Sequence, residues 1–65
     1  MLNASLIQLV GTKTGAVAVL QASNGRENQY IVQEFEGQTL RFSRSFPTKP
    51  AALYHANTIA NRRQR

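Results

Sequence analysis

The 65-residue sequence has no cysteine, no aspartate, no tryptophan and a single histidine, His55. Without cysteine the chain can form neither disulfides nor zinc–thiolate centres, and one histidine cannot build a metal site alone. We therefore expect no cofactor. A Ser-His-acid triad would have to combine His55 with one of three glutamates, and no nucleophile-elbow motif is present. We expect a protein without enzymatic activity, and a pocket holding His55 within hydrogen-bonding distance of a glutamate would argue against that expectation.

Long apolar runs are also missing. Residues 6–10 are too short for a signal peptide, and nothing approaches a membrane span. These absences lead us to expect a soluble cytoplasmic protein that does not bind membranes. A chain of this length forms one domain and buries only about 60% of its unfolded surface. Since disulfides and metals are excluded, we expect the remaining stability to come from close packing or from a homo-oligomer.

Negative charge is nearly absent from the second half of the chain. The net charge is +5, but residues 1–36 carry −1, whereas residues 37–65 carry +6 and contain no acidic residue. Such an asymmetry favours a polyanion such as nucleic acid, or an acidic protein partner. A solvated basic tail with no partner explains the same distribution, so the charge pattern leaves all three interpretations open.

Four segments have the composition and alternation of β-strands: residues 5–10, 15–22, 28–35 and 39–46. Glycine-containing turns separate them. Asn24–Gly25 lies between two apolar runs, which is the strongest short-range signal for a hairpin turn. In the last segment Leu40, Phe42 and Phe46 are expected on one face of the sheet. Thr39, Arg41, Ser43 and Ser45 are expected on the other face.

The end of the chain predicts one helix. Pro47 ends the last strand, Thr48 is a suitable N-cap, and the helix is expected from residue 49 to residue 62. Its apolar stripe consists of Ala52, Leu53, Ala56, Ile59 and Ala60. His55 lies largely away from this stripe, so we expect it to be exposed or half-exposed.

Together these elements predict an α+β fold: a small antiparallel β-meander of three to four strands with one C-terminal α-helix packed on one face. Residues 1–61 form the single domain, and residues 62–65 form a basic C-terminal tail. The first hairpin is apolar on both faces, and one helix covers only one of them. We therefore expect a homodimer, through the second sheet face or through an edge strand.

The residues of the last strand suggest how nucleic acid would be bound. A row of donors on a sheet face can enter the major groove of duplex DNA, and a basic tail adds affinity that does not depend on sequence. The predicted nucleic-acid-binding residues are Arg41, Ser43, Arg44, Lys49, Arg62, Arg63 and Arg65. We place duplex DNA binding first. The alternative is a protein-interaction module or small regulatory subunit that associates through the open sheet or meets an acidic partner.

The strand–helix junction carries a local resemblance. Phe46-Pro47-Thr48, followed by an alanine-rich segment from Ala51 to Ala56, is similar to the junction in sheet-plus-helix DNA readers such as the N-terminal arm-binding domains of phage integrases. The resemblance is confined to this junction, and the arginine-rich early strands of those domains are absent. It implies a sheet that contacts DNA with a helix packed behind it, and it carries no claim of membership.

Overall fold

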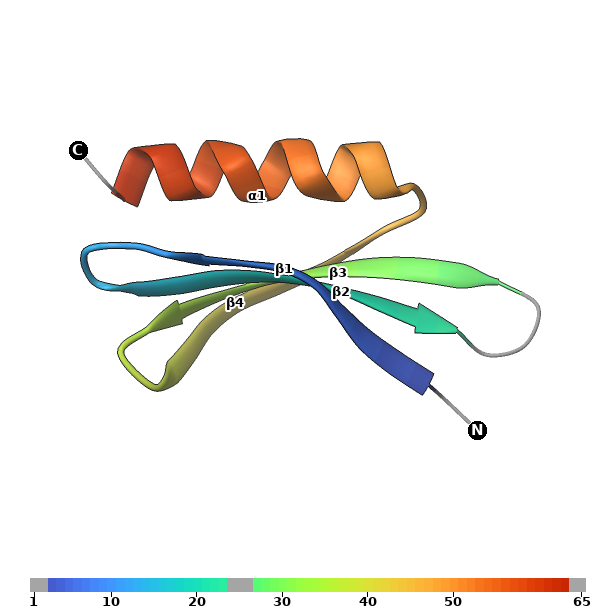
Figure 1. The fold of residues 1–65 in the computed structure, drawn as a ribbon, viewed down its shortest axis with the longest axis horizontal. Helices are drawn as coiled ribbons and strands as arrows, with labels where there is room; N and C mark the ends of the chain where they lie inside the picture. The colour runs from blue at the N-terminus through green and yellow to red at the C-terminus, as the bar shows by residue number, and fades with distance from the viewer. Residues whose placement is uncertain (1–2, 24–26, 64–65) are drawn as a thin grey trace.

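The computed structural model describes residues 3–23 and 27–63, which form four strands and one helix. The elements are β1 (Asn3–Gly11), β2 (Gly15–Ser23), β3 (Asn28–Glu36), β4 (Thr39–Phe46) and α1 (Lys49–Arg63). The strands form one antiparallel sheet in the order β1-β2-β3-β4, and α1 lies along one face of it (Figure 1). The predicted α+β meander with one C-terminal helix is confirmed.

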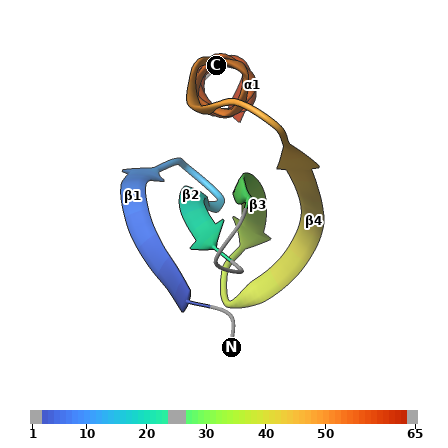
Figure 2. The same cartoon turned by 90° about the vertical axis from the view of Figure 1, so that its right-hand side faces the viewer.

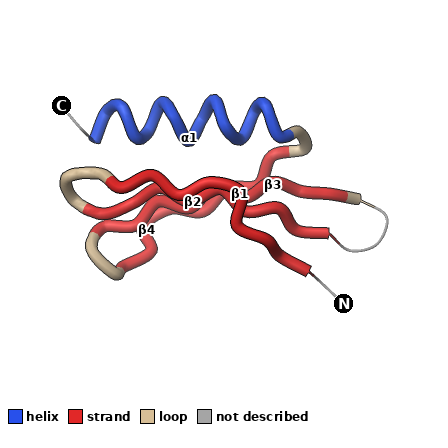
Figure 3. The backbone as a smooth tube through the Cα atoms, viewed as in Figure 1, coloured by secondary structure: helices blue, strands red, loops and turns tan. Residues whose placement is uncertain are grey.

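Two turns lie together at the end of the sheet where α1 finishes (Figure 3). The backbone N–H of Gly37, in the β3–β4 turn, donates a 2.7 Å hydrogen bond to the carbonyl of Thr14, in the β1–β2 turn. Gly37 has a φ of 61°, a conformation that costs a residue with a side chain roughly 1–2 kcal/mol. The predicted hairpin turn at residues 24–25 lies outside the described residues, but β2 and β3 on either side of it are paired from end to end.

Each edge strand contains a β-bulge. The extra residue is Ile7 in β1 and Arg41 in β4. Because a bulge shifts the alternation of side chains by one residue, Leu40 and Phe42 lie on opposite faces of the sheet. The prediction that they share a face was wrong, since simple period-two alternation does not anticipate an inserted residue.

The face under α1 holds the core, and we call it the covered face. The buried residues that pack together here are small: Val17, Val19 and Val32 from the sheet, and Ala52, Ala56 and Ala60 from the helix. Alanines spaced four residues apart form one stripe along a helix and let its backbone approach the sheet closely. Half-buried apolar residues surround this cluster: Ile7, Val10, Tyr30, Phe46, Leu53 and Ile59. The predicted apolar stripe of the helix is confirmed.

The start of α1 is fixed by Thr48. Its side-chain oxygen accepts a 3.4 Å hydrogen bond from the backbone N–H of Ala51, and its carbonyl accepts one of 3.3 Å from Ala52. These contacts satisfy N–H groups that have no partner inside the first turn of a helix. Among the described residues, no helix has the length and hydropathy needed to cross a membrane.

The other sheet face, which we call the open face, has no described element packed against it (Figure 2). The strand register places large apolar side chains there: Leu6, Leu9, Leu20, Ile31, Phe35 and Leu40. A helix is only about 10 Å wide, so one helix cannot enclose both sides of a four-stranded sheet.

Candidate nucleic-acid interface

A groove of about 470 Å³ separates β4 from the C-terminal half of α1. Its lining combines two basic, one acidic, two ring-bearing and one aliphatic side chain: Glu34, Phe42, Arg44, His55, Ile59 and Arg62. We call it the β4–α1 groove. Its residues come from β3, from the edge strand β4 and from the helix, so the groove exists only in the folded chain.

The bulge at Arg41 directs the side chains of β4 into this groove. After the bulge, Phe42, Arg44 and Phe46 all lie on the covered face. Because β4 is the edge strand, α1 does not fully cover them: Phe42 is 37% exposed, and Arg44 is exposed. An arginine and an aromatic ring are thereby presented to solvent from the same face of the strand.

Rings form one wall of the groove. The imidazole of His55 stacks on Phe42, with centroids 5.8 Å apart and planes 29° apart, and it is tilted against Phe46 at 5.1 Å. The guanidinium carbon of Arg44 lies 5.3 Å from the centroid of the Phe46 ring, within the range of a cation–π contact. This contact holds a positive charge over the ring of Phe46, which packs against His55 but does not itself line the groove.

His55 is more involved in packing than the sequence predicted. It is half-buried, as expected, but it packs against two rings of β4 instead of lying clear of the sheet. Its Nε2 atom is buried and has no hydrogen-bond partner. Glu34 lines the same groove, yet His55 Nε2 does not hydrogen-bond to it. A buried polar atom without a partner costs about 1–3 kcal/mol, so it calls for an explanation.

Two of the seven predicted nucleic-acid-binding residues meet in the groove. Arg44 comes from β4 and Arg62 from the last turn of α1. Lys49 is exposed at the first position of α1 and lines no cavity identified in the described part of the chain. Arg63 is the last residue of α1, and Arg65 lies outside the described residues.

The predicted row of donors on one sheet face is not formed. Ser43 and Ser45 share the open face as expected, whereas Thr39 lies on the covered face together with Arg44. Arg41 occupies the bulge and forms an ion pair with Glu36, with Nε and Oε2 3.7 Å apart and both side chains more than half exposed. Pairs this exposed contribute little to stability, and solvent and salt screen them.

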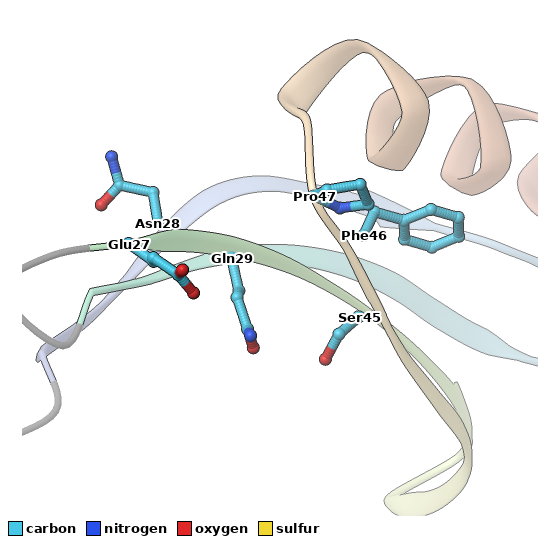
Figure 4. Close-up of a pocket in the computed structure, with 6 residues that line it drawn as sticks. All are labelled: Glu27, Asn28, Gln29, Ser45, Phe46 and Pro47. Atoms are coloured by element: carbon cyan, nitrogen blue, oxygen red, sulfur yellow. The ribbon is translucent and has the colours of Figure 1, made fainter.

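A second cavity, of about 500 Å³, lies at the opposite end of β4, between the start of β3 and the strand–helix junction. It is lined by Glu27, Asn28, Gln29, Ser45, Phe46 and Pro47. Figure 4 shows the side chain of Asn28 projecting to one side of β3, whereas those of Glu27, Gln29 and Ser45 project to the other. None of the described residues that line this cavity is basic, which makes it a poor candidate for a polyanion although it is slightly larger than the β4–α1 groove.

Residues 3–23 and 27–63 contain no cluster of three histidine, aspartate or glutamate side chains that could hold a metal ion. Comparison with known proteins adds no assignment: no family model, no curated protein and no solved structure matches this chain. Any functional conclusion must therefore come from the groove and from the open face.

Proposed function

We propose that the protein is a non-enzymatic module that binds nucleic acid through the β4–α1 groove, with Arg44 and Arg62 contacting backbone phosphates. The observation that supports this proposal is that two arginines, one from a strand and one from a helix, line a single groove. Guanidinium groups bind phosphate oxygens bidentately, which makes arginine well suited to this task. The +6 charge of residues 37–65 supplies attraction over a longer range.

The ring-lined wall adds a second kind of contact. The exposed part of Phe42 offers a surface on which a base can stack. Lys49 and the C-terminal arginines add affinity that does not depend on sequence. We expect duplex DNA as the main target; a preference for single strands would point instead to stacking on Phe42.

The proposal is tested by fluorescence anisotropy with a labelled duplex and its separated strand over a range of salt concentrations. We expect binding that weakens steeply between low and physiological salt. Arg44→Gln and Arg62→Gln should each reduce the slope of log affinity against log salt by about one unit for every phosphate that the variant no longer neutralises.

Lys13→Gln is the matched control. It removes the same charge from an exposed turn residue that lines neither cavity, so its effect should be clearly smaller. Absence of binding to either probe at low salt would exclude the proposed function. Equal reductions for Lys13→Gln and Arg44→Gln would show that net charge acts without the groove.

The open face favours a second candidate function, association with a protein. It presents Leu6, Leu9 and Leu40 to solvent, and exposed apolar patches rimmed by polar residues mark interaction surfaces. This activity is compatible with nucleic-acid binding because the two surfaces lie on opposite sides of the sheet.

A further inference from the structure

We infer that the partner on the open face is a second copy of this chain, and that the two sheets pack face to face with the helices on the outside. This inference rests on the proposed association through the open face and is independent of nucleic-acid binding. The resulting assembly has four layers, helix–sheet–sheet–helix, and carries one β4–α1 groove on each outer side.

The chemistry of the open face favours a copy of itself over a charged partner. Among the paired residues of the described strands, the register places no charged residue on this face: its polar members are the amides Gln29 and Gln33 and the hydroxyls Ser43 and Ser45. An acidic partner would find no countercharge here. Two copies of this face related by a twofold axis bring together no like charges from the paired strand residues, although each chain carries +5.

The three exposed leucines supply the driving force. Leu6 is 59% exposed, Leu9 is 60% exposed and Leu40 is 47% exposed, and they lie on the two edge strands, so they flank the face. Leu20, Ile31 and Phe35 are half-buried between them. In a twofold dimer both copies bury the same set of side chains, so each of these residues contributes its apolar area twice to the interface.

The dimensions of the face suit a small dimer. A strand of nine residues is about 30 Å long, and four strands span about 15 Å, so two such faces together bury on the order of 1,000 Å². That area is close to the lower limit of a specific interface. Twisted sheets of this kind pack about 10 Å apart with their strands about 30° from alignment.

Pairing through an edge strand is disfavoured. Both free edges of the sheet, β1 and β4, contain a bulge, at Ile7 and Arg41. A bulge interrupts the row of free backbone groups and twists the edge, which hinders the addition of another strand. Of the two dimer arrangements expected from the sequence, the face-to-face arrangement is therefore the one that the structure favours.

The first test is sedimentation equilibrium of the full chain from low to high micromolar concentration. We expect twice the chain mass, with tighter association at higher salt because screening weakens the repulsion between two basic chains. Leu9→Gln combined with Leu40→Gln should weaken the dimer at least a hundredfold. Tyr54→Gln is the matched control, since it removes a 76% exposed aromatic ring from α1 and should leave the mass unchanged.

The second test does not depend on the folding of the leucine variant. The chain has no cysteine, so Gln33→Cys places a single thiol on the open face, and Tyr54→Cys places one on the helix. As protein concentration rises into the dimer range, alkylation of the first thiol should slow at least tenfold. Alkylation of the second should keep its rate.

The possible outcomes distinguish a homodimer from the broader proposal that the open face binds a protein. A wild-type chain that stays monomeric at all concentrations contradicts the homodimer. If a different protein then co-purifies in equal amount after nuclease treatment, and the leucine variant no longer binds it, association through the open face stands with another occupant. If no protein is bound, both ideas fail. A dimer that survives the leucine substitutions with an unprotected Gln33→Cys thiol uses another surface and overturns the inference.

Discussion

The two faces of the sheet differ in a way that runs against simple expectation. The fully buried cluster of the covered face consists of valine and alanine side chains, and larger apolar residues are only half-buried around it. The open face, which has nothing described against it, carries leucine, isoleucine and phenylalanine. On the two central strands the larger apolar side chains therefore lie on the side that faces solvent in the isolated chain, although burying a side chain of this size contributes about 1.5–3 kcal/mol.

Close approach of the helix explains the small residues of the covered face. Ala52, Ala56 and Ala60 leave no room for larger partners beneath them, so the valines fill the space. The open face has no such constraint. Its side chains suit a partner surface about 10 Å away, which is the spacing of two packed sheets. The comparison teaches that the size of the apolar residues on a face depends on what packs against it.

The substitution with the largest expected effect on this difference between the faces places a charge at the centre of the covered face. Val32→Asp places a carboxylate where the exposed fraction of the side chain is 0%. An unpaired buried charge costs several kcal/mol, which matches the whole stability of a domain this small. We expect loss of the folded state by circular dichroism. Gln29→Asp, on the same strand but at an exposed position of the open face, should keep the wild-type spectrum, and equal unfolding of both variants would contradict the distinction between the faces.

The two glycines of the first turn give a finer test. A Cβ on Gly15, on the covered side, would overlap the carbonyl oxygen of Phe35, whereas a Cβ on Gly11, on the open side, would meet nothing within 4 Å. We expect Gly15→Ala to lower the free energy of unfolding by about 1–3 kcal/mol, as overpacking does. Urea denaturation at one fixed protein concentration measures the change. Gly11→Ala should stay within about 0.5 kcal/mol of the wild type; a larger decrease there would show that the open side is tightly packed.

The smallest expected change in stability comes from a substitution at the edge of the covered face. His55→Leu removes the buried Nε2 atom that has no partner and keeps an apolar contact with Phe42 and Phe46. We expect a gain of about 1 kcal/mol, which raises the melting temperature of a domain this size by about 4–8 °C.

The same variant should bind the labelled oligonucleotides as tightly as the wild type, because the Nε2 atom is buried and a ligand in the groove does not reach it. His55→Gln keeps a polar atom near that position and serves as the control, since it should not gain stability. A His55→Leu protein that is no more stable than the wild type would show that the imidazole nitrogen costs the fold nothing.

The sequence predicts most of the fold because its local signals agree. Glycine-rich turns, Pro47 and the Thr48 cap mark the element boundaries, and the alanine spacing identifies the helix face. The bulges at Ile7 and Arg41 were not predicted, since neither residue type distinguishes a bulge from regular pairing. The bulge at Arg41 changed the expected faces, because it placed Leu40 on the open face while Phe42 stayed on the side of Arg44 and His55.

The groove itself depends on contacts that no local pattern encodes. Arg44 and Arg62 were both singled out for their charge, but nothing in the sequence places them together. The packing of His55 against two rings follows from how β4 runs along the helix, which is a property of the assembled sheet. Residue types led to the hypothesis of a polyanionic ligand, whereas the position of the groove required the tertiary structure.

The order of the strands also governs how quickly this chain reaches its structure. Every strand pairs with the strand next to it in sequence, so no long loop has to close before the sheet forms. Topologies built from such local pairings fold faster than other sheets of equal size. The helix is the last element of the chain, and its capped first turn follows β4 directly. We expect the hairpins to form early and the alanine stripe to dock last, so substitutions at Ala52, Ala56 and Ala60 should mainly accelerate unfolding and leave the folding rate nearly unchanged.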